Sequence, residues 1–177
     1  MAFRHSPVQA LEQPVTLWRV GHPAYPLWTG LGASIRGGRW NSPGHPVIYA
    51  SVHYSLTLLE VLANLSAKSV PRGFVRSSMR VVKGVSIERV NPMHVPGWRG
   101  PEHPEATRFG DRWLEEGRSL LLFVPSAVVE GLEENVLINP NHPEFANTQI
   151  AAPVPVDWDL RLFPSPASVR ASRGSRE

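Results

Sequence analysis

The sequence contains no cysteine, and this absence excludes disulfide bonds, thiolate nucleophiles and cysteine-ligated metal sites. It also contains no apolar run near the roughly 18 residues that a transmembrane helix needs, so we expect no membrane span. The first residues, 1–14, lack the apolar core of a secretory signal peptide. Together these absences predict a cytoplasmic protein that is not attached to a membrane.

Lysine is nearly absent, since Lys68 and Lys83 stand against sixteen arginines, and the formal net charge is +3. An arginine guanidinium is always charged, and its planar set of donors suits phosphates and carboxylates. A net charge of +3 is too small to indicate nucleic-acid binding by itself, and the sequence has no helix-turn-helix pattern. A non-catalytic, basic nucleic-acid-binding module therefore stands as an alternative from another functional class.

Close groups of metal ligands are missing as well. The seven histidines are scattered, and none of them forms an HExxH motif or another close pair. We therefore expect no metal site.

The overall composition is typical of a globular protein, with 42% hydrophobic and 19% charged residues. The 18 prolines predict many turns and short secondary-structure elements. We expect a loose N-terminal arm over residues 1–14, one folded domain over residues 15–163 and a disordered tail over residues 164–177.

Strands are predicted to outnumber helices and not to alternate with them regularly, which favours an α+β fold with a compact mixed sheet and few helices. Residues 73–82 and 84–90 are expected to form a hairpin around Lys83 and Gly84. Helices are expected at residues 52–65, with Ser51 as N-cap, and at residues 104–117. The remaining strands are expected at residues 15–20, 47–50, 118–124, 134–139 and 156–163.

The predicted helix over residues 52–65 carries a narrow polar stripe. At 100° per residue, its polar side chains fall within about 60° of one another, and nearly all other positions are apolar. This pattern predicts a mostly buried helix whose stripe faces a cleft, a partner or a small solvent window. The stripe consists of His53, Thr57, Glu60 and Asn64. A glutamate in a cleft is a candidate acid, base or stabiliser of a cation, and Glu60 is therefore the principal candidate.

A second candidate is the segment RGGRWNSPG at residues 36–44. Its paired glycines allow close approach of backbone amides, and Arg36 and Arg39 flank them, which suits a phosphate or pyrophosphate. The spacing matches neither the P-loop nor the GxGxxG pattern. A simple glycine turn with two solvated arginines is the alternative interpretation.

Three further polar residues lie within or beside predicted strands. If the first strand is central, Arg19 needs a buried anionic partner, either Glu60 or a ligand. Tyr49 is either a core aromatic or a stacking platform. Ser126 follows a proline and is placed to cap a segment or bind a ligand, although no GxSxG motif surrounds it.

Taken in order, several segments resemble the RES-domain family over residues 17–163. These are WRV, GGRWNSPGHPVIYAS, SLTLLEVLANL, GDRWL, LLLFVPSAVV and NVLINPNHPEF. The resemblance implies the toxin of a type II toxin–antitoxin pair, whose partner is an Xre-like helix-turn-helix antitoxin. It also implies a fold similar to that of ADP-ribosyltransferase toxins, with NAD⁺ consumed as a substrate and no separate cofactor.

The same resemblance assigns roles to individual residues. Glu60 would stabilise an oxocarbenium-like transition state, and Arg19 and Arg39 would offset the charge of the pyrophosphate. Tyr49 would stack on a ring or orient the nicotinamide ribose, and Ser126 would hydrogen-bond the nucleotide. The predicted catalytic residues are Glu60, Arg39 and Tyr49, and the predicted substrate-binding residues are Arg19, Arg39, Tyr49, Ser126 and Asn139. His142 lies in the same family segment as Asn139, without an assigned role.

The expected activity is cleavage of the nicotinamide–ribose bond of NAD⁺, as a glycohydrolase or a phosphorylase. A mono-ADP-ribosyltransferase that modifies a host protein is the alternative, because the donor site is the same. The antitoxin is expected to occlude the active site and to make any contact with DNA itself. A homo-oligomer is left open.

Overall fold

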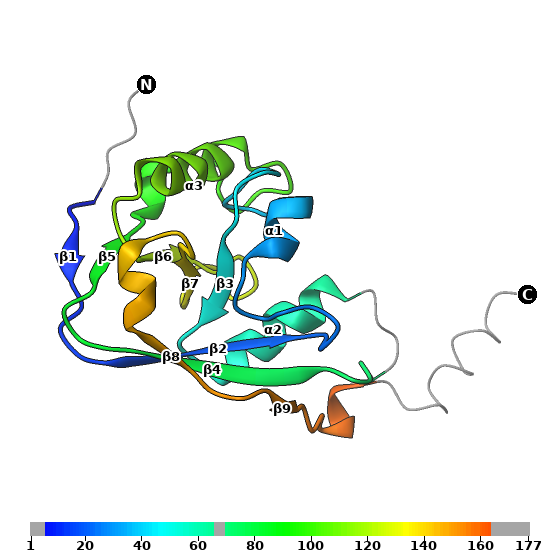
Figure 1. The fold of residues 1–177 in the computed structure, drawn as a ribbon. Helices are drawn as coiled ribbons and strands as arrows, with labels where there is room; N and C mark the ends of the chain where they lie inside the picture. Colours follow the sequence, from blue (N-terminus) through cyan, green and yellow to red (C-terminus); the bar gives the residue numbers. More distant parts are fainter. Residues whose placement is uncertain (1–5, 66–69, 164–177) are drawn as a thin grey trace, which may run out of the picture.

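Among the residues that the computed structural model describes, 6–65 and 70–163, nine strands form one sheet (Figure 1). Their order is β1-β5-β6-β7-β3-β2-β4-β8, and β9 pairs with β4. β5 and β6 are parallel and all other neighbours are antiparallel, which confirms the predicted α+β class with a mixed sheet. The strands are β1 Gln9–Ala10, β2 Val15–Gly21, β3 Ile48–Ser51, β4 Val75–Val81, β5 Ser86–Arg89, β6 Leu121–Pro125, β7 Glu134–Ile138, β8 Thr148–Ile150 and β9 Val154–Pro155.

Alternate residues of the central strands divide between two apolar clusters, as the period of a strand requires. Ile48 and Ala50 of β3 belong to one cluster, whereas Tyr49 packs against the other. The second cluster includes the apolar side of helix α3 (Pro104–Glu116), which lies near β5 and β6 at the top of Figure 1. Pro104 opens this helix and the left-handed Gly117 ends it, as predicted from the sequence.

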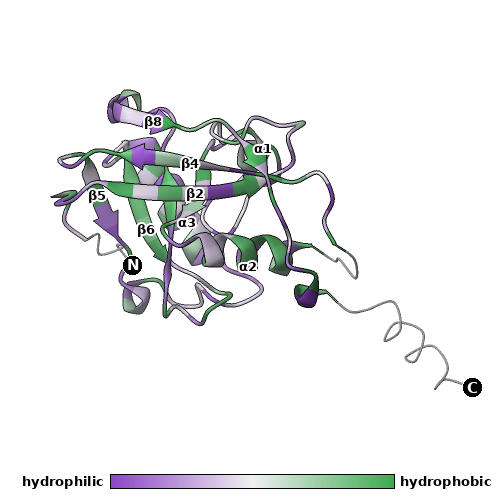
Figure 2. Cartoon of the chain, turned by 90° about the horizontal axis from the view of Figure 1, so that it is seen from below, coloured by the Kyte–Doolittle hydropathy of each residue, from purple (hydrophilic) through white to green (hydrophobic). Residues whose placement is uncertain are grey.

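Helix α2 (Tyr54–Asn64) is largely apolar in sequence. It packs along β2, and Figure 2 shows the two elements side by side. The prediction that it is mostly buried is wrong, because only Leu56 and Thr57 are buried and Leu59 is 42% exposed. The polar stripe is also divided. Thr57 is buried and bonds the Trp18 carbonyl at 3.3 Å, whereas His53 and Asn64 are exposed.

The N-cap of the helix lies two residues after the predicted one. His53, not Ser51, is the N-cap residue of α2. Ser51 stays in β3 because its backbone pairs with Asn135 of β7 and its hydroxyl donates to the Asn135 side chain at 2.6 Å. The Ser51 hydroxyl, which was expected to cap the helix, is therefore engaged in a hydrogen bond between β3 and β7.

The predicted hairpin over residues 73–90 is wrong. β4 pairs with β2 on one edge and with β8 and β9 on the other, so it has no free edge for β5. β5 pairs with β1 and β6 instead. Residues of the predicted loose arm take part in this pairing, because Leu11 exchanges hydrogen bonds of 2.8 Å with Gly84 and Val85 and is 9% exposed. The arm is therefore ordered at residues 9–11.

The predicted strand over residues 156–163 is wrong, because these residues are irregular apart from a 3₁₀ turn at Leu160–Leu162, and the short strands β8 and β9 lie before them. Proline at positions 153 and 155 removes backbone donors on both sides of Val154, which keeps β9 short. Trp158 packs edge-on against Phe74 and Phe163, with ring centroids 6.5 Å and 5.9 Å away. The tail predicted for residues 164–177 lies outside the described residues.

The segment between β2 and β3 contains a short helix, α1 (Leu31–Arg36), where the sequence predicted only turns. Glycines bound this helix on both sides, and both have positive φ, 70° at Gly30 and 72° at Gly37. In the part of the chain that is described, no helix has the length and apolarity to cross a membrane.

Gly110 of α3 allows the helix to approach the segment that carries Arg39. A Cβ atom at Gly110 would lie 1.8 Å from the backbone oxygen of Trp40, so no side chain fits there without moving the helix. We expect Gly110→Ala to lower the free energy of unfolding by about 2 kcal/mol or more, despite the better helix propensity of alanine.

The matched control is Gly32→Ala in α1, where the nearest atom to a Cβ is the end of the Arg36 side chain at 3.9 Å. This variant should be neutral or more stable by up to about 1 kcal/mol. Urea unfolding of both variants checks the contrast, and equal stabilities would contradict the proposed close approach.

Candidate active site

Glu60 is held by two side chains from other parts of the fold, and a third side chain supports one of them. Its Oε1 accepts hydrogen bonds from the Ser126 hydroxyl at 2.7 Å and from the Asn135 amide. Asn135 in turn accepts the hydrogen bond from Ser51. Among the described residues, no hydrogen bond reaches Oε2 of Glu60, so one carboxylate oxygen is fixed and the other is available.

The Ser126 hydroxyl donates to this carboxylate. Its side chain is fully buried at the end of β6 and its hydroxyl is used by Glu60. Its backbone is fixed as well, because its N–H donates to the Glu133 carbonyl at 2.9 Å and its carbonyl accepts from Gly131 at 2.7 Å. In this arrangement Ser126 supports Glu60, and the direct nucleotide contact expected from the sequence stays a prediction.

Asn135, which the sequence did not predict as a site residue, bonds Glu60, whereas the predicted Asn139 does not. The two residues lie four positions apart at opposite ends of β7, about 13 Å along the strand. Asn139 Oδ1 accepts from the backbone of Asn141 at 3.0 Å and closes a turn. His142 accepts from the Glu144 backbone and caps the next turn, so neither Asn139 nor His142 joins the Glu60 network.

Arg39 lies close enough to Glu60 for the two charges to interact. Burial lowers the pKa of the Arg39 guanidinium, and the charges of Glu60 and Tyr49 partly oppose that shift. Its Nη1 donates to the carbonyl oxygens of Trp98 and Gly100, the latter at 2.9 Å. Its Nε and Nη2 form no hydrogen bond with any described residue, so they are available to an anion.

Arg19 is a partly buried cation in a central strand, since β2 lies between β3 and β4. Burial lowers the pKa of Arg19 to about 10. Its Nη1 donates to the Tyr49 carbonyl, and its buried Nε has no hydrogen-bond partner. No carboxylate of the described residues pairs with it, so the expected ion pair with Glu60 is not formed. An anionic ligand, the other expected partner, stays a prediction.

Tyr49 supports the segment that carries Arg39. Its hydroxyl accepts from the Trp40 amide at 3.1 Å and donates to Asn41 Oδ1 at 2.8 Å. A Cβ at Gly38 would lie 2.7 Å from this hydroxyl, which explains the glycine there. Burial raises the pKa of Tyr49, so the hydroxyl keeps its proton. The catalytic role assigned to Tyr49 stays a prediction.

The paired glycines do not offer their amides to a phosphate, contrary to the sequence interpretation. Gly37 donates to the Ala33 carbonyl and Gly38 donates to the Asn41 carbonyl, both at 2.8 Å. Arg36 is exposed at the end of α1. The segment therefore contributes the Arg39 side chain and not an amide cradle.

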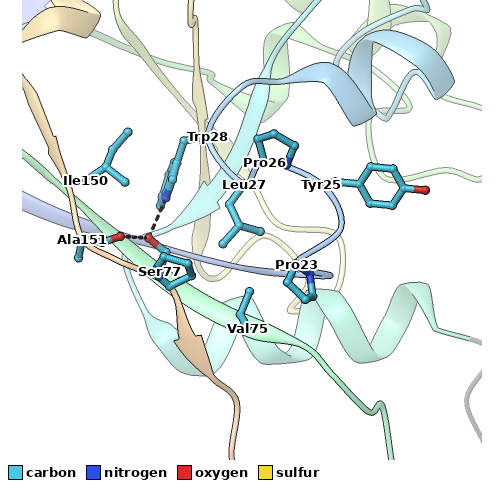
Figure 3. Close-up of a pocket in the computed structure, with 10 residues that line it drawn as sticks. Pro23, Tyr25, Pro26, Leu27, Trp28, Val75, Ser77, Ile150 and Ala151 are labelled. Atoms are coloured by element: carbon cyan, nitrogen blue, oxygen red, sulfur yellow. Dashed lines mark hydrogen bonds between the residues drawn. The ribbon is translucent and has the colours of Figure 1, made fainter.

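Neither of two surface pockets contains these side chains. One is lined mainly by apolar residues, and Figure 3 shows Trp28 donating to Ser77, and Ser77 to the Ala151 carbonyl, at its rim. The other lies where β3, β5 and β6 end and β7 begins, and Arg89 and Glu134 pair in its wall. The described residues contain no group of three acidic or histidine side chains placed to hold a metal.

Comparison with known proteins identifies relatives over most of the chain. A family model described as the RES domain matches residues 16–159. "Toxin Res" of Yersinia enterocolitica is 38% identical over 138 residues, which cover 76% of this chain and 90% of that protein. "Prs ADP-ribosylating toxin" of a Sphingobium strain is 37% identical over 120 residues, which cover 66% and 74%.

A solved structure shares the fold. It is the crystal structure of the Mycobacterium tuberculosis MbcT–MbcA toxin–antitoxin complex, which matches with a TM-score of 0.65 over 94% of this chain and 92% of the matched chain. The sequence identity is 17%, so this likeness concerns the arrangement of helices and strands.

The unpaired Arg19 is expected to reduce stability. Its pKa is lowered relative to the unfolded chain, so at every pH below about 10 the folded state bears the cost of the buried charge, and only above that pH is the cost relieved. We expect Arg19→Met to raise the free energy of unfolding by on the order of 1–2 kcal/mol at neutral pH, even though the bond to Tyr49 is lost.

The control is Arg80→Met on the exposed side of β4, which should change stability by less than about 0.5 kcal/mol. Urea unfolding at pH 7 measures both. A less stable Arg19→Met protein would show that the guanidinium is compensated in the folded state.

Proposed function

The chain belongs to the RES-domain family, and on that premise we propose that it is the toxin of a toxin–antitoxin pair and cleaves the nicotinamide–ribose bond of NAD⁺. The observation that carries this proposal is the Glu60 carboxylate, fixed at one oxygen and available at the other. Two arginines with unused donors, Arg19 and Arg39, accompany it.

The chemistry follows from these charges. When the bond between ribose and nicotinamide breaks, its electron pair leaves with neutral nicotinamide and positive charge develops on the sugar. A fixed carboxylate stabilises this oxocarbenium-like state, which is the role that we assign to Glu60. Ser126 and Asn135 hold the carboxylate so that it need not reorganise during the reaction. Arg19 and Arg39 would bind the pyrophosphate through charge-assisted hydrogen bonds.

Three acceptors are compatible with this donor site. Water gives a glycohydrolase, inorganic phosphate gives a phosphorylase, and a protein side chain gives a mono-ADP-ribosyltransferase. The name of the Sphingobium relative favours the third acceptor for that protein. In each case NAD⁺ is the substrate, and we expect the reaction to take place in the cytoplasm.

The nucleic-acid-binding alternative gains no support from the site. Arg19 and Arg39 donate to backbone carbonyls and are partly withdrawn from solvent, whereas a surface that binds DNA exposes its arginines. The arginine excess elsewhere in the chain does not form part of the site.

The first functional prediction concerns Glu60. We expect the purified protein to release nicotinamide from NAD⁺, and Glu60→Gln to reduce the rate by at least ~10²-fold because the neutral amide cannot stabilise the cation. Chromatography of nicotinamide measures the rate, and mass spectrometry of the nucleotide product with and without phosphate and cell lysate identifies the acceptor. Glu12→Gln, which changes an exposed glutamate, is the control. Wild-type turnover by Glu60→Gln would show that the glutamate is structural.

We further propose that an Xre-like helix-turn-helix antitoxin restrains the enzyme. The structural neighbour was crystallised with an antitoxin. An acidic side chain or a C-terminal carboxylate of the partner would form charge-assisted hydrogen bonds with Arg19 and Arg39, where the pyrophosphate is expected. The antitoxin would bind DNA, and this chain would contact DNA only through it.

Occlusion predicts competition between the two ligands of the site. NAD⁺ titrated into the complex of this chain with its antitoxin should weaken the complex, because both ligands use the same arginines. Isothermal calorimetry at several NAD⁺ concentrations measures this effect, and a turnover assay tests the complex itself. A complex that cleaves NAD⁺ at the rate of the free enzyme would refute occlusion and leave the role of Glu60 intact.

A further inference from the structure

Two loops that carry no predicted site residue except Ser126 meet at Trp98. Trp98 lies in the loop before α3, and its side chain packs against the second apolar cluster. A Cβ at Gly131, in the loop between β6 and β7, would lie 3.2 Å from Cζ2 of Trp98, so the indole ring lies directly on the Gly131 backbone. Arg99 and Glu130 face each other across the same contact, with nitrogen and oxygen 3.5 Å apart.

Each loop holds one of the two principal charges of the site. The carbonyls of Trp98 and Gly100 accept hydrogen bonds from Arg39. On the other loop, the Gly131 amide donates to the Ser126 carbonyl at 2.7 Å, and the Ser126 hydroxyl donates to Glu60. The contact between Trp98 and Gly131 therefore connects the support of Arg39 to the support of Glu60.

The β6–β7 loop is strained at this contact. Glu130 has φ 62° and Gly131 has φ 81°, and Glu130 is the one non-glycine residue with positive φ in the described chain. Such a backbone costs on the order of 1 kcal/mol and persists when its surroundings determine it. The ion pair with Arg99 is too exposed to do so, since the two side chains are 53% and 69% exposed. The hydrogen bond from the Gly131 amide to the Ser126 carbonyl and the indole ring on Gly131 are the remaining constraints.

We propose that Trp98 is a positioning residue that sets Arg39 relative to Glu60 for the binding of NAD⁺. This inference rests on the proposed function. The guanidinium has free donors only on the side away from the two carbonyls, so the carbonyls fix the direction in which those donors point. Without the indole ring, the loop that bears both carbonyls loses its anchor on Gly131, and Arg39 loses a defined orientation.

The expected kinetic result is a change in KM. Because Arg39 is proposed to bind the pyrophosphate, which is present in substrate and transition state alike, Trp98→Ala should raise KM for NAD⁺ by on the order of 10-fold and lower kcat by less than about 3-fold. Trp98→Phe keeps a ring against Gly131 and should restore KM to within about 3-fold of wild type. Trp158→Ala removes a tryptophan that packs on Phe74 and should leave KM unchanged.

A double-mutant cycle separates positioning from direct contact. If Trp98 acts through Arg39, then Trp98→Ala should change KM by less than about 2-fold in an Arg39→Ala background. If the two effects multiply, Trp98 touches the substrate itself or acts through another residue, and the proposal is overturned. An unchanged KM in the single variant overturns it as well.

Hydrogen exchange gives a readout that needs no turnover. Trp98→Ala should increase amide exchange over residues 126–134, above all at Gly131, although the substitution lies in the other loop. Trp158→Ala should not do so. Absence of NAD⁺ cleavage by the wild-type protein would refute the proposed function, whereas unchanged exchange over residues 126–134 would refute the contact between the loops whether or not NAD⁺ is cleaved.

Discussion

The fixed carboxylate of Glu60 is the constraint on which the rest of the site depends. One oxygen accepts from Ser126 and Asn135, so α2, β6 and β7 must meet at a single atom, and Ser51 adds β3 through Asn135. Buried polar groups of this kind are favourable only when each has its partner. The mixed sheet brings these segments together because β3 and β7 pair in register with Ser51 opposite Asn135.

The two arginines of the site are held less completely than Glu60. Glu60 has neutral partners that fix it, whereas Arg19 and Arg39 have backbone carbonyls and unused donors. A buried guanidinium without an anion reduces the stability of the folded chain, and such a cost is typical of a site whose missing charge is supplied by a ligand. Neither arginine has an anionic partner in the described chain. A doubly charged pyrophosphate would supply the negative charge and the acceptor oxygens for their unused donors.

The β4–β5 segment and helix α2 show why local patterns were insufficient. Residues 73–90 contain two strand-forming runs around a glycine, which is typical of a hairpin, but β2 and β8 take both edges of β4. The choice of partner is decided by strands that are distant in the sequence. The apolar surround of α2 predicted burial, yet the helix covers β2 with one side only and leaves Leu59 exposed.

The sequence by itself located several of the elements and pointed to the candidate charges of the site. Period and composition located β2, β3, α2 and α3 closely, and the order of the motifs indicated the family that the comparisons confirm. Only the tertiary structure decided which asparagine serves Glu60, that Ser126 is buried behind the carboxylate, and that Trp98 connects two loops. The physical reason is that these contacts join residues far apart in the chain, and local propensity contains no information about which distant side chain completes a hydrogen bond.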